Sequence, residues 1–390
     1  MLDWPNRFFM PTQMEVGKGL AQKIGEMLKP YNHKNILIVT DKGLLQAGIL
    51  KPIEKSLEEH GIQYVLYDEV EPNPSAQIAH RGSDVAKEYG CDAILGVGGG
   101  SSIDTAKGIA ALVTNKGNIL DFEGVGKLSE PALPIYAIPT TAGTGSEGTA
   151  SAVFTNKETL YKAVIISPYL YPKLAILDPL LMVELPASIT AATGMDALTH
   201  AIESYTSKGA NSMSQGLAIH AVKMIRENLL KTYFVGTDIE SRENMLVASM
   251  IAGVAFAQSR LGNVHAISHT FGGVFNIPHG IANATLLPYV LQFNLPACPE
   301  RMRDIAVALG KDVSGLTPLA AAEKAVEAVV EMNEALGIPK TIKELGVTLD
   351  YLPQMVSDAM KSGNILANPR LTKANDVQMI IENAYHGVLT

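Results

Sequence analysis

The stretch Ala93-Ile-Leu-Gly-Val-Gly-Gly-Gly-Ser-Ser102 decides the fold class of this chain. Residues 93–97 are apolar, which predicts a strand buried on both faces, and a helical pattern follows over 103–112. Glycines let backbone amides approach a phosphate group, and a helix N-terminus adds unpaired N–H groups and positive potential. A strand, a glycine loop and a helix in this order indicate an α/β domain with a phosphate-binding loop.

Further strand patterns lie on both sides of this stretch. Buried strands are expected at 36–39, 64–67, 135–138 and 174–177, with helical patterns between them. Alternating strands and helices predict a mostly parallel sheet with helices on both faces. Two hairpins are also expected, one of 152–154 with 163–166, and one at the sheet edge, of Phe8-Phe9-Met10 with Met14-Glu15-Val16.

The composition of the chain changes after Leu185-Pro186, where strand patterns stop and Ala, Leu, Met and Glu become more frequent. A chain of 390 residues is long for one core. We therefore expect two domains, an α/β domain over 1–185 and an all-α domain over 186–390. Helical patterns in the second domain cover 187–205, 212–234, 241–259, 318–336 and 372–387.

Composition excludes several classes of protein. The net charge is −8 and no basic run occurs, which argues against nucleic acid or an anionic membrane as a partner. The only two cysteines, Cys91 and Cys298, are far apart, which favours a reducing compartment. Residues 1–10 lack the apolar core of a signal peptide, and the apolar run 245–256 is too short to span a bilayer. We expect a soluble, cytoplasmic protein.

Two features besides the glycine loop suggest a nucleotide. Thr140 to Ser146 is a second small, hydroxyl-rich loop that follows a strand. Asp41 ends a strand, where a carboxylate can accept hydrogen bonds from ribose hydroxyls and would repel a 2′-phosphate, so NAD is favoured over NADP. Asp41 fits equally well as a helix cap. The glycine loop also has a purely structural alternative, because Ser101 stands where the Gly-x-Gly-x-x-Gly pattern requires its last glycine.

Histidines and one carboxylate gather in the second domain. Asp196 and His200 are four residues apart in a helical pattern, so their side chains share one face. His265 and His269 repeat this spacing, and His279 lies between a proline and a glycine, where a turn is expected. A carboxylate and several imidazoles make a divalent transition-metal site. A lone Asp-x-x-x-His pair would more often be a cap, a surface pair or a core histidine.

With these residues taken together, the sequence resembles the iron-dependent (group III) alcohol dehydrogenases over essentially its whole length. The resemblance rests on motifs in a fixed order: Gly98-Gly-Gly-Ser-Ser-Ile-Asp-Thr-Ala-Lys107, Thr140-Thr-Ala-Gly-Thr-Gly-Ser-Glu147, Ser167-Pro168, Asp178-Pro179, Gly194-Met-Asp-Ala-Leu-Thr-His-Ala-Ile-Glu203, His265-Ala-Ile-Ser-His269, Pro278-His-Gly-Ile-Ala-Asn283 and Asn368-Pro-Arg370.

The resemblance implies a Rossmann-like, NAD-binding first domain and a helical second domain, with the metal in the cleft between them. It implies metal ligation by Asp196, His200, His265 and His279. It implies NAD contacts by Asp41, Asn73, Gly99, Gly100, Ser101, Thr140, Thr141, Thr144, Ser146, Lys162 and Leu181. The histidine matching His269 lies beside substrate and nicotinamide in such enzymes, so His269 is the catalytic candidate. It would pass the alcohol proton to solvent, or else only pack around the site.

The implied activity is metal-dependent, reversible hydride transfer between a small primary alcohol or diol and NAD⁺, with the aldehyde as product. The ligand set would accept Fe²⁺, Zn²⁺ or another divalent metal, and the resemblance favours Fe²⁺. Phe256 matches a pocket-lining position. Departures from the family at Ala257-Gln258-Ser259 and Ser362-Gly363-Asn364 predict tolerance of a second hydroxyl. We also expect a homo-oligomer, a homodimer or larger.

Two other functions compete with this one. A dehydroquinate-synthase-like lyase would use NAD only transiently, but such enzymes need several Lys and Arg residues to hold an acidic substrate, and the motifs of the second domain are apolar. A filament or scaffold protein with a vestigial site would not need intact ligands and two glycine loops. Net NADH production from a simple alcohol distinguishes the first alternative, and metal-dependent turnover distinguishes the second.

Overall fold

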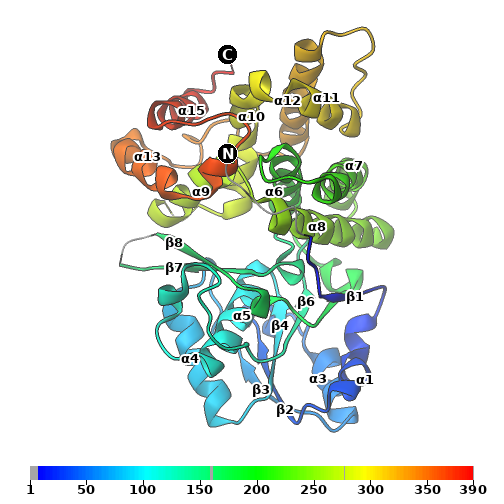
Figure 1. The fold of residues 1–390 in the computed structure, drawn as a ribbon. Coiled ribbons are helices and arrows are strands. Elements are labelled where there is room, and N and C mark those ends of the chain that lie inside the picture. The colour runs from blue at the N-terminus through cyan, green and yellow to red at the C-terminus, as the bar shows by residue number, and fades with distance from the viewer. Residues whose placement is uncertain (1–7, 159–160, 276, 390) are drawn as a thin grey trace. The chain divides into compact units, whose positions relative to one another are not determined.

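The computed structural model describes residues 8–158, 161–275 and 277–389, which form two compact units (Figure 1). One unit comprises Met10–Thr141 and Gly145–Glu184 and contains both sheets. The other is helical. It runs from Leu185 onward and also takes in Phe9 and Ala142–Thr144. No pattern in the sequence indicated that these two short pieces belong to the helical unit.

Six parallel strands form the main sheet, in the order β1-β9-β6-β4-β2-β3. This order confirms the predicted Rossmann-like α/β architecture, because the strands are parallel and α-helices lie in the connections from β1 to β2, β2 to β3, β3 to β4 and β4 to β6. The strands are β1 (Gln13–Val16), β2 (Asn35–Val39), β3 (Gln63–Tyr67), β4 (Ala93–Gly98), β6 (Ile135–Pro139) and β9 (Leu174–Leu177).

Helices cover both faces of this sheet, as Figure 1 shows. Ile36 and Ile38 of β2 belong to the core cluster that includes side chains of α1 and α3, whereas Leu37 and Val39 belong to the cluster with α4 and α5. Successive side chains of a strand point to opposite faces of the sheet, so β2 contributes apolar residues to the core on each face. The helices of this unit are α1 (Ile24–Leu28), α2 (Lys42–Gln46), α3 (Lys51–Glu59), α4 (Ala76–Glu88) and α5 (Gly100–Thr114).

The two predicted hairpins had different outcomes. A second sheet has the order β5-β8-β7, from β5 (Gly124–Val125), β7 (Ser151–Thr155) and β8 (Lys162–Ile166), and its antiparallel β7–β8 pair confirms the predicted hairpin. The predicted edge hairpin at 8–16 is wrong.

Two pairings take the place of the edge hairpin. β1 pairs in parallel with β9, Gln13 opposite Leu174. Phe9 instead bonds to a side chain, because its N–H donates to Gln258 Oε1 (3.0 Å) and its carbonyl accepts from Gln258 Nε2 (2.9 Å). The amide of Gln258 thus satisfies the backbone groups that a hairpin partner would have satisfied.

The predicted long helices of the second unit are confirmed to within a few residues, and α9, α10, α11, α13 and α14 are additional. The helices are α6 (Ala187–Thr206), α7 (Ser212–Phe234), α8 (Ile239–Ser259), α9 (Asn263–Val274), α10 (His279–Asn294), α11 (Pro299–Ala308), α12 (Pro318–Ala335), α13 (Leu352–Lys361), α14 (Asn364–Ala367) and α15 (Ala374–His386).

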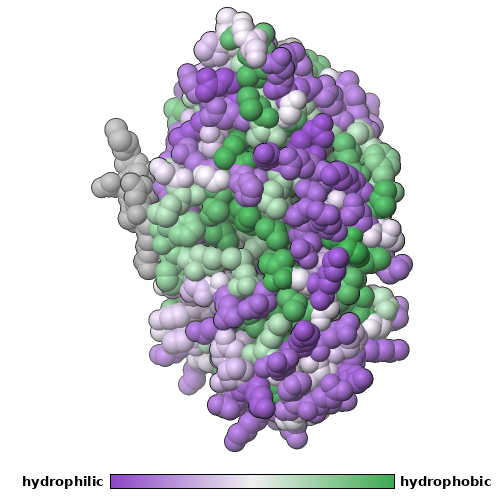
Figure 2. Space-filling view, turned by 90° about the vertical axis from the view of Figure 1, so that its right-hand side faces the viewer, coloured by the Kyte–Doolittle hydropathy of each residue, from purple (hydrophilic) through white to green (hydrophobic). Residues whose placement is uncertain are grey.

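The surface mixes hydrophilic and apolar side chains, as Figure 2 shows for one face. Phe234 and Leu371 are among the large apolar residues that are mostly exposed. Scattered exposed apolar residues are ordinary on folded proteins. Within the described ranges no single helix has the length and apolar character to cross a membrane, and one bent pair, α8 with the start of α9, meets those two criteria only when counted together.

Candidate metal centre and cofactor loops

Helix α6 supplies three buried ionisable side chains, Asp196, His200 and Glu203. Their spacing of four and then three residues places them on one face of the helix. The rest of α6 around them is apolar and equally buried, with Met195, Ala197 and Leu198 fully inside. Ionisable groups are costly to bury among such residues unless they bond to one another or to an ion.

The remaining histidines come from α9 and α10. His265 and His269 lie one turn apart on α9, and His279 is the first residue of α10. The expected turn at His279 is therefore wrong. Pro278 has an extended ψ of 130° and leads into the helix, since a proline close to a helix start sacrifices no N–H bond.

Three candidate ligand atoms converge in this unit. Those of Asp196, His265 and His279 all lie within 4.8 Å of one another. Asp196 Oδ1 is 3.9 Å from Nε2 of each of the two histidines. A carboxylate and imidazoles are donors that suit a divalent transition metal, so these residues fit such an ion.

The other two predicted histidines lie next to this group. The ring of His200 stacks on those of His265 and Phe256, with centroids 4.6 Å apart in both cases, and its Nδ1 is 3.3 Å from the carbonyl oxygen of Gly143. No nitrogen of His200 belongs to the converging group. The ring of His269 lies 5.2 Å from that of His279. His200 is therefore adjacent to the candidate ligands, and His269 is on their edge.

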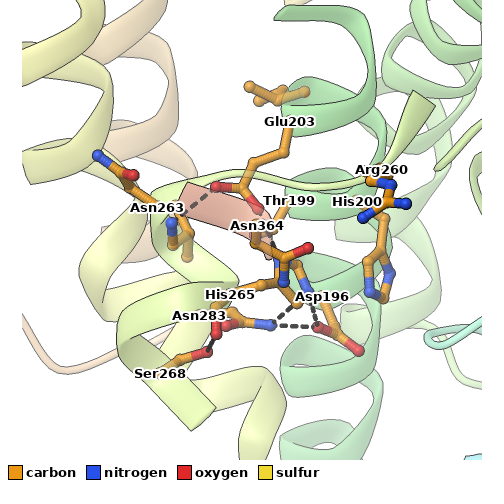
Figure 3. A network of polar contacts seen from close by, with 12 residues as sticks. Asp196, Thr199, His200, Glu203, Arg260, Asn263, His265, Ser268, Asn283 and Asn364 are labelled. Atoms are coloured by element: carbon orange, nitrogen blue, oxygen red, sulfur yellow. Dashed lines mark hydrogen bonds and ion pairs between the residues drawn. The ribbon is translucent and has the colours of Figure 1, made fainter. Parts of the chain in front are cut away.

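Asn283 is a site residue at the end of the motif Pro278-His-Gly-Ile-Ala-Asn283, and no role was expected for it from the sequence. Its Nδ2 donates to Asp196 Oδ1 (2.6 Å) and lies 3.1 Å from Nε2 of both His265 and His279, as seen partly in Figure 3. All three lone pairs therefore point toward one small volume. The four-residue spacing of His279 and Asn283 on a helix was the available signal.

Glu203 binds His265 from the opposite side of the ring (Figure 3). Its Oε2 lies 2.6 Å from His265 Nδ1, and its Oε1 accepts a hydrogen bond of 2.7 Å from the Val264 N–H. Burial raises the pKa of the Glu203 carboxyl to about 7, although the backbone N–H groups at the start of α9 oppose this shift.

The glycine loop lies between β4 and α5, as predicted. Gly98 has a φ of +146°, and a Cβ there would come within 2.4 Å of Ser102 Oγ, so only glycine fits. Gly98 also accepts a hydrogen bond from the Thr140 N–H (3.0 Å). A Cβ on Gly99 would be 3.4 Å from Thr141 Oγ1. The two predicted loops are therefore neighbours at the carboxyl ends of β4 and β6.

Other predicted cofactor residues belong to the same α/β unit, apart from Thr144. Asp41 caps α2, because its Oδ1 accepts a 3.0 Å bond from the Leu44 N–H. Lys162 Nζ donates to Asn73 Oδ1 (2.8 Å). This bond brings together two residues that are distant in sequence and that were both predicted to contact NAD. The remaining members of the predicted set are Gly100 and Ser101 in the first turn of α5, Ser146 after the second loop, and Leu181 in the 3₁₀ turn Pro179–Met182.

A buried charge cluster joins α5 to the second loop, and sequence reasoning missed it. Lys107 is fully buried, and its three N–H groups are shared among five oxygens of Ser146, Thr149 and Ser151, which lie 2.7–3.1 Å from Nζ. Asp104 accepts from Ser146 Oγ (2.6 Å). Burial lowers the pKa of Lys107 to about 8 and raises that of Glu147 to about 7.

A parallel sheet with glycine-rich loops at its carboxyl edge, and a separate cluster of imidazoles and a carboxylate, are typical of metal-dependent, nucleotide-linked enzymes. The chain matches two family descriptions, "Iron-containing alcohol dehydrogenase" over residues 11–179 and "Fe-containing alcohol dehydrogenase family, C-terminal" over residues 190–385. It belongs to the iron-containing alcohol dehydrogenase family.

Individual relatives agree with this membership. An NAD-dependent methanol dehydrogenase of Bacillus methanolicus is 43% identical and aligns over 97% of this chain and 99% of its own length. A 1,3-propanediol dehydrogenase of Klebsiella pneumoniae is 42% identical over 97% of this chain and 98% of its own. The solved structure of an alcohol dehydrogenase from Oenococcus oeni has a TM-score of 0.95 at 39% identity, covering 98% of this chain and all of the other.

Proposed function

We propose that the protein transfers hydride reversibly between small primary alcohols or diols and NAD⁺, forming the aldehyde and NADH. The observation that carries this proposal is the convergence of Asp196, His265 and His279 ligand atoms within 4.8 Å in a chain of this family. Membership of the family, rather than the ligand set alone, favours this activity over a lyase that uses NAD only transiently.

In this proposal Asp196, His265, His279 and the adjacent His200 hold the metal. The chemistry that a divalent cation supplies when bound there is Lewis-acid polarisation of the substrate oxygen. The donors accept Zn²⁺ as well as Fe²⁺, and the family favours iron. His200 would have to move closer to the other three residues, because none of its nitrogens lies within 4.8 Å of all their converging atoms.

The α/β unit would hold the dinucleotide. The N–H groups at the start of α5 would bind the diphosphate, because Gly98 and Gly99 leave the backbone uncovered there. The unused oxygen of Asp41 would accept from a ribose hydroxyl while the other caps α2, so the two roles of Asp41 are compatible. Thr140, Thr141, Thr144, Ser146, Asn73, Lys162 and Leu181 complete the proposed NAD contacts.

His269 is the proposed proton carrier. It lies one turn beyond His265 on α9 with its ring next to that of His279, and it is partly exposed, so it can reach solvent. An imidazole titrates near neutral pH and can take the alcohol proton as hydride leaves the carbon.

The proposed substrates are short. Relatives are named for methanol, 1,3-propanediol and lactaldehyde. The expectation that Gln258 helps to accommodate a second substrate hydroxyl needs correction, because its side-chain amide bonds to the backbone of Phe9. Asn364, at the start of α14, which packs against α9, is then the candidate that would bind the second hydroxyl of a diol.

A substrate panel tests the proposal. Anaerobic assays with added Fe²⁺ should give NADH from short primary alcohols and from 1,3-diols, and no NADH without metal. A lyase would give no net NADH, and a scaffold protein would give no turnover, so either result contradicts the proposal. The cytoplasmic location and the homo-oligomeric state stay predictions.

A further inference from the structure

The ring of His265 is bonded at both nitrogens, each time by a side chain that is not among the proposed ligands. Glu203 of α6 lies at Nδ1 (2.6 Å), and Asn283 of α10 lies at Nε2 (3.1 Å). All three residues are fully or almost fully buried. The two contacts together determine which ring nitrogen carries the proton.

The orientation of Asn283 is fixed by Asp196. A carboxylate oxygen only accepts, so the atom of Asn283 that lies 2.6 Å from Asp196 Oδ1 must be the amide nitrogen. Nδ2 of this amide lies 3.1 Å from Nε2 of both His265 and His279, so its second N–H is directed between these two nitrogens. His265 Nε2 accordingly presents a lone pair.

The proton of a neutral His265 is then on Nδ1, where the Glu203 carboxylate accepts it. The other Glu203 oxygen is already occupied by the Val264 N–H (2.7 Å). The same carboxylate therefore holds both the start of α9 and the tautomer of the histidine on its first turn.

We propose that Glu203 is a positioning residue that holds His265 in the Nδ1–H tautomer, so that the Nε2 lone pair faces Asp196 and His279 before any metal arrives. This inference rests on the proposed role of His265 as a ligand. Carboxylates that accept from the second nitrogen of a ligand histidine typically raise metal affinity 10- to 100-fold.

The decisive variant is Glu203→Gln, which keeps the size of the side chain. A glutamine offers one oxygen and one NH₂ group, whereas the glutamate offers two acceptors. The Val264 N–H cannot change its role, so the oxygen stays with it and the NH₂ group faces His265 Nδ1. His265 then faces a donor at each nitrogen and can relieve the conflict at Nδ1 by moving its proton to Nε2, because the second N–H of Asn283 can turn wholly to His279 Nε2. A proton on Nε2 blocks the nitrogen that would bind metal.

The matched control is Asn368→Ala. Asn368 Oδ1 also binds the start of α9, through the Asn263 N–H (3.3 Å), and makes no hydrogen bond to His265. This control loosens α9 as a purely structural defect would. Any effect through the tautomer is specific to Glu203.

The test uses the full-length protein labelled with ¹⁵N-histidine, stripped of metal with a chelator, and the His265→Gln variant to assign the His265 signals. We expect Nδ1–H in the wild type and in Asn368→Ala, and Nε2–H in Glu203→Gln. Equilibrium dialysis against Co²⁺ or Zn²⁺ should show at least a tenfold loss of affinity in Glu203→Gln and less than a threefold loss in Asn368→Ala.

Three results would overturn the inference: Nε2–H in the wild type, unchanged Nδ1–H with full affinity in Glu203→Gln, or equal affinity losses in Glu203→Gln and Asn368→Ala. The first of these needs no variant to fold. A His265→Gln protein that keeps full metal affinity would instead refute the ligand role in the proposed function, and the tautomer measurement would still stand.

Discussion

Asp41 combines a structural and a proposed functional role in one side chain. It caps α2 through Oδ1 at 3.0 Å, and its charge would repel the 2′-phosphate of NADP⁺. We expect Asp41→Asn to raise the ratio of kcat/KM for NADP⁺ to that for NAD⁺ at least tenfold, because asparagine caps equally well without the charge. Asp41→Gly should give the same shift with a small loss of stability. A shift in the glycine variant alone would mean that the cap, and not the charge, sets the preference.

His269 and His279 are neighbours to which we assign different roles. We expect His279→Ala to empty the metal site and abolish turnover, since its Nε2 belongs to the converging group. His269→Ala should keep the metal and lose 10²- to 10⁴-fold in kcat, as for a lost general acid–base group. Metal analysis of both variants, with the exposed His220→Ala as reference, tests the assignment. A His269→Ala protein without metal would reverse the two roles.

Glu147 makes the stability of the protein depend on pH. Burial raises its pKa from 4.5 to about 7, and its Oε1 has no hydrogen-bond partner among the described residues. The folded state binds the Glu147 proton more tightly than the unfolded state. The contribution of this protonation to the free energy of unfolding is therefore complete below pH 4.5 and is lost as pH rises through 7.

We therefore expect the wild type to lose about 3 kcal/mol of unfolding free energy relative to Glu147→Gln between pH 4.5 and pH 8. Urea unfolding at several pH values measures the difference, with the exposed Glu323→Gln as the control. A difference that stays constant across this range would show that Glu147 does not titrate in the folded protein.

At the scale of elements, close approach of α10 to α6 brings His279 to Asp196. A Cβ on Gly280 would lie 2.3 Å from the carbonyl oxygen of Ala192, and backbone cannot move aside as a side chain can. Alanine favours helix by about 1 kcal/mol over glycine. We still expect Gly280→Ala to lower the free energy of unfolding by roughly 1–3 kcal/mol, which is the usual cost of overpacking. The same variant should bind less metal.

Gly216→Ala in α7 is the matched control, because nothing lies within 4 Å of its added Cβ. This substitution should raise the melting temperature and leave the metal content unchanged. Equal stabilisation of both alanine variants would mean that α6 and α10 are not in close contact at Gly280.

At the scale of the molecule, the metal and most of the NAD contacts are proposed on different compact units. Stripping the metal with a chelator should abolish turnover while NADH binding, followed by its fluorescence, changes less than about threefold, because the N-terminus of α5 and the capped Asp41 do not depend on the ion. Turnover should return with Fe²⁺. Loss of NADH binding together with the metal would show that the ion helps to hold the dinucleotide.

Sequence patterns predicted most of the fold, because the physics behind them is local. Apolar runs of four or five residues predicted β2, β4, β6 and β9, and Ala- and Leu-rich patterns predicted α6, α7 and α8. The edge hairpin failed because β1 finds its partner in β9, at Leu174, which no local pattern can indicate.

The sequence by itself determined which residue types are available: the helical spacing of Asp196 and His200, the glycine loop before α5, and the resemblance that joined them. Tertiary structure alone decided what these residues meet. Asn283 lies between three candidate ligands, Glu203 binds His265, and Lys107 Nζ lies within 3.1 Å of five oxygens, all through contacts between distant segments. Spacing fixes the face of a helix, whereas packing fixes which faces touch, and hydrogen-bond partners follow from that contact.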